Sequence, residues 1–578
     1  MIEPGLDPTN QEHIPTLAED PALGLPQRAK MEILFAVMLG LFLGALDQTI
    51  VGPALPKIVT QLAGNDLYTW VVAIYLLTST ITVPFWGKLS DLYGRKPMFL
   101  IGIGIFMAGS ALSGLSQNMA MLLTFRGIQG IGAGSLFPIA IAIIGDLFTP
   151  AERGKYQGLF GAVFGISALI GPALGGLLTD LVSWHWIFYV NIPVGFASLY
   201  FVWRLLPTVK RANASRNFDL LGAAVFSVAM GFLLIGLTNA QTGQWTDATV
   251  GGFMLIALVG TVLFLLVEAR AKEPIVPLDL FRLRTYTSSM LAVFFASFGF
   301  FGAIIFLPRW FQFVLGYSAT ASGYATLPLL VGLIGSSIVS GLIVSRTGRY
   351  KWLTVGSVGI MAIGLALLSQ LRADTSVPLL WFWMFVTGVG VGPTLATFTI
   401  IVQNSVPFQV LGVATANLTF FRQIGGTIGL TIAGTIFGTT LQEQLFPQMT
   451  AAGVPQGVVA GFQRASGSGG LDFNQLAGVG VNLGKAIVDL VPPQFQASVQ
   501  PYVPNIIDGI HRAFSLGVAQ TFYIAVAAAL VAGVAAAAMI EHPLRTSMMA
   551  TQPHPSTAKA GAAPVGTPGA ERTATQPD

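Results

Sequence analysis

The sequence predicts an all-α protein that crosses a membrane many times, and three observations predict this class. Hydrophobic residues make up 53% of the chain and charged residues only 9%, whereas about a quarter of the residues of a soluble domain are charged. The chain contains fourteen hydrophobic segments, each long enough for a helix to cross the roughly 30 Å of bilayer hydrocarbon. Basic residues concentrate in alternate connections between these segments, as in membrane proteins of fixed orientation.

The predicted spanning helices are largely uncharged stretches of roughly 18 to 28 residues. They lie near residues 33–54, 68–87, 98–117, 120–146, 157–180, 186–206, 218–239, 249–268, 287–314, 322–345, 352–371, 377–402, 411–439 and 516–540. The polar segment at 1–30 lacks the basic start and short apolar core of a signal peptide, so we expect the first hydrophobic helix to act as the insertion signal. The tail at 541–578 is rich in Pro, Thr, Ala and Gly and is expected to be disordered.

Charge placement predicts the orientation. An N-terminus in the cytoplasm puts 21 of the 29 Lys and Arg residues on the cytoplasmic side and five on the outer side. Because positive charge favours cytoplasmic loops, we predict a multi-pass membrane protein with both termini in the cytoplasm. The lipid bilayer is its first expected partner.

An internal repeat links two cytoplasmic connections. Gly87 lies seven residues before the pair Gly94-Arg95, and Gly341 lies seven residues before the pair Gly348-Arg349. Parallel six-helix halves produce such a duplication. The expected divisions are an N-terminal half at 31–206, two inserted helices with their linkers at 207–285, and a C-terminal half at 286–540.

One outer connection, at about 441–513, is far longer than most loops in compact domains. Within it, Val458–Phe462 and Leu476–Leu490 are candidates for short amphipathic helices at the membrane surface. Two interpretations remain open: a tolerated insertion, or a surface for a periplasmic or cell-envelope partner.

Two full charges interrupt otherwise apolar helices. A charge in hydrocarbon costs at least about 3 kcal/mol and faces a bundle interior or a water-filled cavity. Asp47 lies on the outward-running first helix and Arg126 on the inward-running fourth helix, so both fall at similar depth in the outer half. A nearby guanidinium favours an ionised carboxylate, whereas desolvation favours the neutral acid. We hypothesise that Asp47 is a proton-coupling site with Arg126 as its electrostatic partner; a static pair that fixes helix packing is the alternative.

Five motifs resemble those of the major facilitator superfamily, in its fourteen-helix drug:proton antiporter branch. They are Leu46–Pro56, Gly87–Lys96, Arg126–Gly130, Gly165 with Gly171–Gly176, and Trp184–Pro193. Gly52-Pro53 departs from the Asn-Val that is usual in this branch, but Asp47 is retained. The resemblance covers roughly residues 31–440 and the last helix. It implies the major facilitator fold, with two six-helix bundles plus two inserted helices.

The resemblance also implies an activity. The expected protein is a proton-coupled secondary transporter in the cytoplasmic membrane of a bacterium. It is expected to export amphipathic drugs or other hydrophobic small molecules by alternating access, so protons and such molecules are expected partners. An exporter of lipids or glycolipids is the alternative. An uptake symporter is disfavoured by the glycine-rich fifth helix, and a non-transporting membrane scaffold is disfavoured by the two charges at matched depth.

Two motifs are expected to serve conformational change. Gly94 permits a tight turn, and the Asp91 carboxylate is suited to cap a helix N-terminus. The resulting cytoplasmic latch comprises Gly87, Asp91, Gly94, Arg95 and Lys96. The antiporter glycine motif comprises Gly165, Gly171, Pro172, Gly175 and Gly176. Its small residues are expected to pack tightly on the helix at 322–345, either as a seal against proton leak or as ordinary packing.

Four polar residues in the predicted helices are candidates to line a cavity: Gln129, Asn191, Arg422 and Gln423. Arg422 falls near the middle of the bilayer, beside Gln423. Three interpretations of Arg422 remain open: it faces the cavity, binds an anionic headgroup, or pairs with an unidentified acid.

Other function classes find no support in the residues. The chain has no cysteine, its five histidines lack metal-site spacing, and Gly480–Ala486 lacks the spacing and the Ser or Thr of a phosphate-binding loop. We therefore expect no enzyme activity, catalytic residue, metal, cofactor or nucleic-acid partner. An ion gradient is expected to supply the energy.

Overall fold

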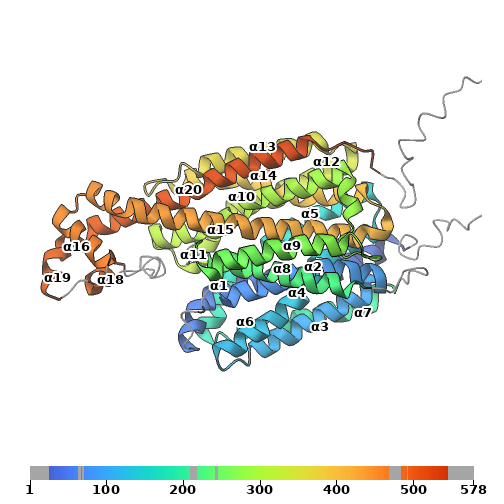
Figure 1. Cartoon of the computed structure of the whole chain (residues 1–578), viewed down its shortest axis with the longest axis horizontal. Helices are drawn as coiled ribbons and strands as arrows, with labels where there is room; N and C mark the ends of the chain where they lie inside the picture. Colours follow the sequence, from blue (N-terminus) through green and yellow to red (C-terminus); the bar gives the residue numbers. More distant parts are fainter. Residues whose placement is uncertain are drawn as a thin grey trace, which may run out of the picture.

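The structure is a computed structural model of the chain, and it describes residues 25–62, 67, 70–208, 218–240, 245–467, 483–490 and 493–544. Within these ranges it is helical and contains no strand, and fourteen helices are long and apolar enough to cross a membrane. The predicted all-α class and the predicted number of spanning helices are therefore confirmed. Figure 1 shows the helices running side by side along the long axis of the molecule.

The N-terminal half encloses the middle of its first helix. Its elements are α1 Gln27–Gln61, α2 Trp70–Tyr93, α3 Arg95–Ser113, α4 Met119–Leu147, α5 Pro150–Leu181, α6 Trp186–Tyr189 and α7 Asn191–Leu205. α1 packs against α4, α5 and α7. α3 and α4 approach closely because Gly109 faces the backbone of Gln129 and Gly132 faces the backbone of Phe106. Small residues permit such contacts between membrane helices.

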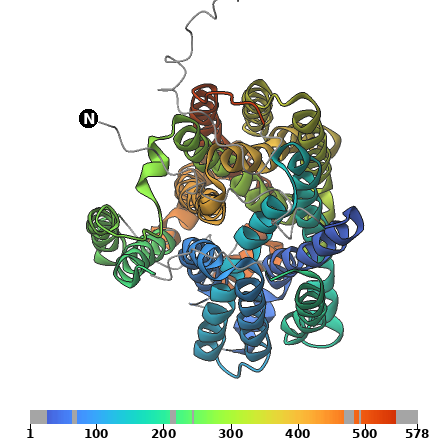
Figure 2. The same cartoon turned by 90° about the vertical axis from the view of Figure 1, so that its right-hand side faces the viewer.

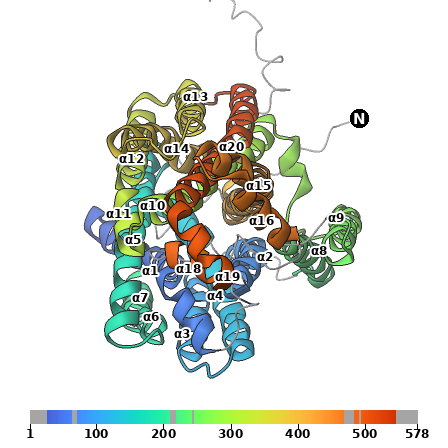
Figure 3. The same ribbon diagram turned by 90° about the vertical axis from the view of Figure 1, so that its left-hand side faces the viewer.

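Two helices follow this half in the sequence and lie at the edge of the bundle. They are α8 Leu220–Asn239 and α9 Phe253–Glu268, the latter preceded by the π-helical turn η3 Ala248–Gly252. They pack on each other, and α8 meets the rest of the bundle through α2 and α15, as Figure 3 shows. Leu258, Val262 and Leu266 are exposed apolar residues on α9. Lipid tails, which are as apolar as leucine, suit this face.

The C-terminal half repeats the packing of the N-terminal half. Its elements are η4 Leu278–Arg282, α10 Arg284–Leu315, α11 Ala319–Ala325, α12 Leu327–Thr347, α13 Lys351–Leu368, α14 Val377–Ser405, η5 Phe408–Val410, α15 Leu411–Ala451 and α20 Val503–Ala537. In the α13–α14 pair, Gly364 faces the backbone of Thr387 and Gly390 faces the backbone of Met361. Glycines thus allow close approach here as they do between α3 and α4.

The repeated motif, which the sequence predicts on the cytoplasmic side, lies in helices. α2 continues to Tyr93, so the expectation that this helix ends near residue 87 is wrong. Gly94 alone separates α2 from α3, and its φ of 96° costs glycine little. Gly348, the counterpart of Gly94 in the repeat, also has a positive φ, of 68°, where α12 ends.

The two halves meet at two equivalent glycines of the repeat. A Cβ added to Gly87 of α2 would collide with the Cβ of Ala416 of α15, and a Cβ added to Gly341 of α12 would collide with the carbonyl oxygen of Gly154 of α5. Figure 2 views the molecule from this end, with the N-terminal and C-terminal helices packed together. The halves are therefore in direct contact at this end.

The structure corrects the boundaries of the predicted outer loop. α15 continues to Ala451 and α20 begins at Val503, so both ends of the stretch at 441–513 are helical. Figure 1 shows α15 and α20 projecting beyond the bundle, with short helices at the tip. These helices are α16 Gln456–Gly467, α18 Leu483–Leu490 and α19 Pro493–Val499, and the 3-10 turn η6 Gln500–Tyr502 leads into α20. We call the described part of 441–513 the extension.

The expected amphipathic helices lie in the extension. Val458–Phe462 is part of α16, and of Leu476–Leu490 only residues 483–490 belong to the described chain, as α18. Figure 1 places both helices at the tip, away from the ends of the other spanning helices, and their expected position at the membrane surface stays a prediction.

An apolar seam explains why α15 and α20 continue into the extension. Leu441, Leu445 and Met449 are buried in one cluster with residues of α20. Their spacing of four places them on one face of α15. Gly509 of α20 lies against the backbone of Met449, and Asn505 Nδ2 donates a hydrogen bond of 2.5 Å to the carbonyl oxygen of Ala452. Polar residues on the opposite faces lower the mean hydropathy of these stretches. The apolar segments at 411–439 and 516–540 are therefore shorter than the helices α15 and α20.

Candidate functional site

Asp47 and Arg126 form a buried ion pair inside the N-terminal half. The Asp47 side chain is fully buried and that of Arg126 is 1% exposed. Arg126 Nη1 lies 2.6 Å from Asp47 Oδ2. The structure thus brings together the two charges that the sequence places at similar depth. Removing one partner of such a pair leaves a buried charge uncompensated, at a cost of about 3–5 kcal/mol.

Two amides complete the coordination of the Asp47 carboxylate. Oδ1 accepts hydrogen bonds from Gln129 Nε2 at 2.8 Å and from Asn191 Nδ2 at 2.9 Å. Gln129 Oε1 in turn accepts a bond of 2.8 Å from Arg126 Nη1. We call Asp47, Arg126, Gln129 and Asn191 the Asp47 cluster; its members come from α1, α4 and α7.

The sequence places Gln129 and Asn191 in a cavity, and the structure places them elsewhere. Both side chains are completely buried and bonded to Asp47, because α4, α5 and α7 pack around α1. The i, i+3 spacing of Arg126 and Gln129 puts both on one helix face, and this was the signal available in the sequence.

Aromatic rings enclose the guanidinium of Arg126. The centre of the Tyr75 ring lies 4.2 Å from Arg126 Cζ, and that of the Phe188 ring lies 5.8 Å away. A cation over a ring face is stabilised by the ring quadrupole, and more so where water is excluded. Neither ring belongs to the predicted site, because the sequence does not show which way a helix faces.

The antiporter glycine motif contacts more than one helix. A Cβ on Gly165 would collide with Ile334 of α12, as expected for a contact with that helix. Cβ atoms on Gly171 and Gly175 would instead collide with Thr49 and Ile50 of α1. The expectation that the whole motif packs on the helix at 322–345 is therefore wrong, because glycines at different heights of the long α5 meet different neighbours.

The outer end of the motif lies near α11. Gly176 has Thr320 Oγ1 as the nearest atom to an added Cβ, at 3.4 Å, and the ring of Pro172 lies 3.6 Å from an added Cβ on Gly323. Ser167 lies between Gly165 and Gly171 of the motif, and its carbonyl oxygen accepts a hydrogen bond of 2.9 Å from Thr49 Oγ1. Thr49 is two residues from Asp47, so α5 is bonded directly beside the Asp47 cluster.

The cytoplasmic latch joins the two halves through Asp91. Its carboxylate accepts hydrogen bonds from the backbone N–H groups of Gly412, at 3.2 Å, and Val413, at 2.8 Å. These groups lie in the first turn of α15, where unpaired N–H groups and the helix dipole favour an anion. The Asp91 side chain thus caps a helix of the opposite half.

Arg95 holds the latch within the N-terminal half. Arg95 Nη1 lies 2.8 Å from Asp91 Oδ1, and Arg95 Nε lies 2.8 Å from Asp146 Oδ2 of α4. Lys88, one turn from Asp91, pairs with Glu273 at 2.7 Å. Asp146 and Glu273 were not singled out in the sequence, because each is distant along the chain from its partner. Lys96 is half-buried and has no hydrogen bond or ion pair with the described residues.

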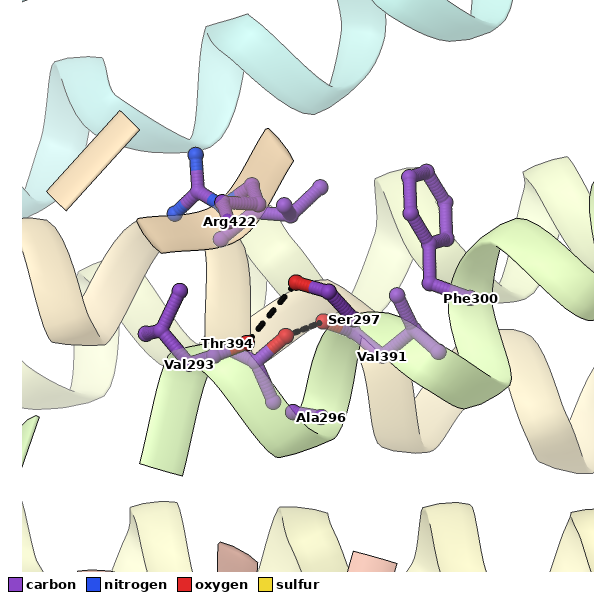
Figure 4. Close-up of a pocket in the computed structure, with 8 residues that line it drawn as sticks. Val293, Ala296, Ser297, Phe300, Val391, Thr394 and Arg422 are labelled. Carbon is purple, nitrogen blue, oxygen red and sulfur yellow. Dashed lines mark hydrogen bonds between the residues drawn. The ribbon is translucent and has the colours of Figure 1, made fainter. Parts of the chain in front are cut away.

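Arg422 lines a pocket in the C-terminal half. Figure 4 shows its guanidinium above the facing helices. The lining residues come from α10, α14 and α15: Val293, Ala296, Ser297, Phe300, Val391, Thr394, Leu395 and Arg422. The Ser297 hydroxyl donates to the carbonyl oxygen of Val293, and the Thr394 hydroxyl donates to that of Val391.

The side chain of Arg422 has no partner among the residues that the structure describes. Nη2 is buried without a hydrogen-bond acceptor, and no acid in the described ranges pairs with the guanidinium. Gln423 does not line this pocket, and its buried Oε1 is also unpaired. Of the expected cavity residues, Arg422 alone lines the pocket described here.

Comparisons with known proteins agree with this architecture. The family profile described as Major Facilitator Superfamily matches residues 37–430. The chain is 37% identical over 497 residues to the multidrug transporter protein MdtP of Bacillus subtilis (strain 168), covering 85% of this chain and 91% of that protein. It is 33% identical over 506 residues to multidrug resistance protein 3 of the same strain, covering 87% and 93%.

Two solved structures share the fold at low sequence identity. The human organic anion transporter MFSD10 has a TM-score of 0.53 and 16% identity, covering 72% of this chain and 94% of that one. The proton:xylose symporter XylE has a TM-score of 0.52 and 16% identity, covering 72% and 90%. The fourteen spanning helices, the repeated glycine contacts between the halves and the match over residues 37–430 lead to one conclusion: the chain belongs to the Major Facilitator Superfamily, in the branch of the multidrug efflux transporters.

Proposed function

We propose that the protein is a proton-coupled secondary transporter that exports amphipathic drugs or other hydrophobic small molecules. The observation that carries this proposal is the Asp47 cluster: an acid without solvent exposure, balanced by one guanidinium and two neutral amides. Adding a proton to Asp47 leaves Arg126 without its counter-charge, so the cluster must rearrange. Gln129 bonds both charged groups, and its amide is free to exchange partners when the proton binds.

The contacts between the halves support alternating access. The latch and the glycine contacts of Gly87 and Gly341 hold one end closed in this conformation. Opening that end requires Asp91 to release the N-terminus of α15. A route from the Asp47 cluster leads there, because α1 is bonded to α5 through Thr49 and α5 packs on α12 of the opposite half.

We infer the cellular setting from the same charges and from the similarity to membrane transporters of Bacillus subtilis. The latch end carries Lys88, Arg95 and Arg153, and positive charge favours the cytoplasmic side. The protein then lies in a bacterial cytoplasmic membrane, with both termini in the cytoplasm and with the extension on the outer side. In that orientation the extension is available to a periplasmic or cell-envelope partner. We assign the protein no enzyme activity.

Export of lipids or glycolipids is the second candidate function. The paired helices of the extension, with their apolar seam, project from the bundle (Figure 1). Such a projection suits a substrate that must be handed away from the membrane. Removing the extension while measuring both drug efflux and lipid export separates the two functions: loss of lipid export alone favours the lipid, and loss of neither rejects it.

The proposed coupling is tested by dye efflux from proteoliposomes under an imposed pH gradient. We expect Asp47→Asn, which keeps the shape but not the charge, to reduce gradient-driven efflux to the level of protein-free liposomes. Asp508→Asn is the matched control, because Asp508 pairs with Arg512 on the exposed part of α20. Full gradient-driven efflux by a folded Asp47→Asn variant would refute the proposal. Arg126→Ala is expected to lose efflux and thermal stability together.

A further inference from the structure

Arg422 is a buried cation whose charge is not satisfied by any residue that the structure describes. Arg95 and Arg126 have carboxylate partners within 2.8 Å, and Arg153 donates to the carbonyl oxygens of Phe148 and Gly145. Arg422 has none of these within the described ranges. An unpaired charge within a membrane-spanning helix costs free energy, and such residues mark substrate or ion pathways.

The surroundings of Arg422 restrict what can bind there. The other residues that line the pocket are apolar, apart from two hydroxyl groups, and none is acidic. Ser297 and Thr394 also line this space (Figure 4); each hydroxyl group donates its proton to a carbonyl oxygen of its own helix and retains lone pairs. The pocket therefore offers one positive charge and two weak polar groups within an apolar wall. A ligand that complements it carries one negative charge and an apolar body.

The apolar wall reaches the contact between the two halves. The Phe300 ring of α10 meets the Phe164 ring of α5 with centroids 6.5 Å apart, and Phe164 meets Phe137 of α4 at 6.0 Å. These three rings cross from the Arg422 pocket into the N-terminal half. Aromatic rings provide large apolar contact areas, so they form a surface for the body of a ligand whose charged group lies at Arg422.

We propose that the Arg422 pocket binds the oxyanion of an amphipathic substrate, with the apolar body of that substrate lying along Phe300, Phe164 and Phe137. A planar guanidinium suits this role because it binds a carboxylate or phosphate through two parallel N–H donors. This inference rests on the proposed export function and names its substrate class: molecules with one anionic group and an apolar tail. The oxyanion belongs either to a free amphiphile or to a lipid headgroup.

The test measures binding without a proton gradient, so it is independent of coupling. The probes are dansyl-undecanoate at pH 8, where its carboxylate is ionised, and its uncharged methyl ester. They are titrated against the purified full chain in nanodiscs of phosphatidylcholine. We expect the wild type to prefer the carboxylate, and Arg422→Gln to weaken binding of the carboxylate by about thirtyfold while changing that of the ester by less than about threefold.

Two further variants separate recognition from folding. Arg309→Gln is the matched control, because Arg309 is an exposed arginine near the outer end of α10 and its removal changes the net charge equally. Arg422→Lys keeps the positive charge but not the two parallel N–H donors of the guanidinium. It is expected to retain part of the preference for the carboxylate over the ester. If Arg422→Gln does not fold, the ratio of carboxylate to ester affinity in the wild type and in Arg422→Lys still decides the question. Equal affinities for the two probes in the wild type, or equal losses in Arg422→Gln, overturn the proposal.

The source of the oxyanion is resolved by the lipid. Nanodiscs with phosphatidylglycerol, an anionic lipid, are compared with nanodiscs of phosphatidylcholine alone. Weaker dansyl-undecanoate binding in phosphatidylglycerol, present in the wild type and absent in Arg422→Gln, identifies a lipid headgroup as a ligand. Unchanged binding identifies a free amphiphile, and both outcomes support an anion site. Loss of efflux in Asp47→Asn with intact carboxylate preference upholds both proposals, whereas full efflux in Asp47→Asn with intact preference refutes only the coupling.

Discussion

Replacing Asp91 by asparagine is expected to open the cytoplasmic end of the molecule. The carboxylate of Asp91 accepts two backbone N–H groups at the start of α15 and thereby ties α2 of one half to a helix of the other. Asparagine has nearly the same shape, but its amide offers one acceptor oxygen and no charge. The substitution therefore removes one hydrogen bond and the attraction to the helix terminus without creating a cavity.

The magnitude follows from these contacts. A hydrogen bond to a charged group contributes about 1.5–3 kcal/mol, and a favourable charge at a helix terminus contributes up to about 2 kcal/mol where it is partly buried. Arg95 keeps Asp146 at 2.8 Å, so no buried cation is left alone and the fold is retained. A net loss of about 2 kcal/mol corresponds to a thirtyfold rise in the ratio of open to closed molecules.

The assay benefits from the absence of cysteine in the chain. Lys155 of α5 and Thr347 of α12 are both exposed and are replaced by cysteine to attach spin labels. Pulsed electron paramagnetic resonance then measures the distance between the two labels, and so between the halves. The ratio of long to short distances is measured under conditions where the wild type populates both. We expect this ratio to rise about thirtyfold in Asp91→Asn.

The control is Asp279→Asn, because Asp279 and Arg282 form an exposed pair and exposed pairs contribute little. It is expected to leave the distances unchanged. A change of less than about threefold in a folded Asp91→Asn variant would contradict the reasoning, since the two bonds to α15 would then contribute little to closure.

Two further predictions use glycines with matched controls. Gly341→Ala places a Cβ against the backbone of Gly154, whereas a Cβ in Gly335→Ala on the same helix meets nothing within 4 Å. We expect only Gly341→Ala to shift the spin-label distances toward the open form. Equal distances in the two variants would contradict a steric role for this contact. The Cβ of Gly509→Ala presses on the backbone of Met449, whereas that of Gly438→Ala in α15 meets nothing within 4 Å. We expect Gly509→Ala, but not Gly438→Ala, to destabilise the extension by about 1–3 kcal/mol, measured as faster protease cleavage of the extension. Unchanged cleavage in Gly509→Ala would show that the seam accommodates the added methyl group without loss of stability.

The spanning helices and the main ion pair were predictable from the sequence, for physical reasons. Apolar length reports a spanning helix directly, and helix direction gives depth, which brings Asp47 and Arg126 to one level. Depth does not give rotation about the helix axis. The amides of Gln129 and Asn191 were therefore expected in a cavity, although they bind Asp47 in the buried cluster.

Contacts between distant elements were the less predictable part. The partner of Asp91 is the backbone of α15, and a backbone group leaves no mark in a sequence. Gly171 contacts Thr49 of α1, although Gly165 of the same motif contacts α12, because the motif is longer than the width of one neighbour. In the extension, a one-sided seam such as that of Leu441 and Leu445 is diluted by polar residues on the opposite face.

The repeat also shows why closure is chemically uneven between the halves. Gly87 and Gly341 are equivalent and both press against a helix of the opposite half. Four residues later, the N-terminal copy has Asp91 and the C-terminal copy has Ser345. Asp91 bonds the start of α15, whereas the Ser345 hydroxyl donates to the carbonyl oxygen of Leu342 in its own helix. The contact between α2 and α15 therefore includes a charged hydrogen-bond acceptor, whereas the contact at Gly341 between α5 and α12 consists of close packing. Because Arg422 lies in α15, twelve residues into the helix that Asp91 caps, a ligand bound at Arg422 and the latch act on the same rigid element. In the transport cycle that we propose, release of α15 by Asp91 is the step at which substrate binding at Arg422 and closure of the latch end are coordinated.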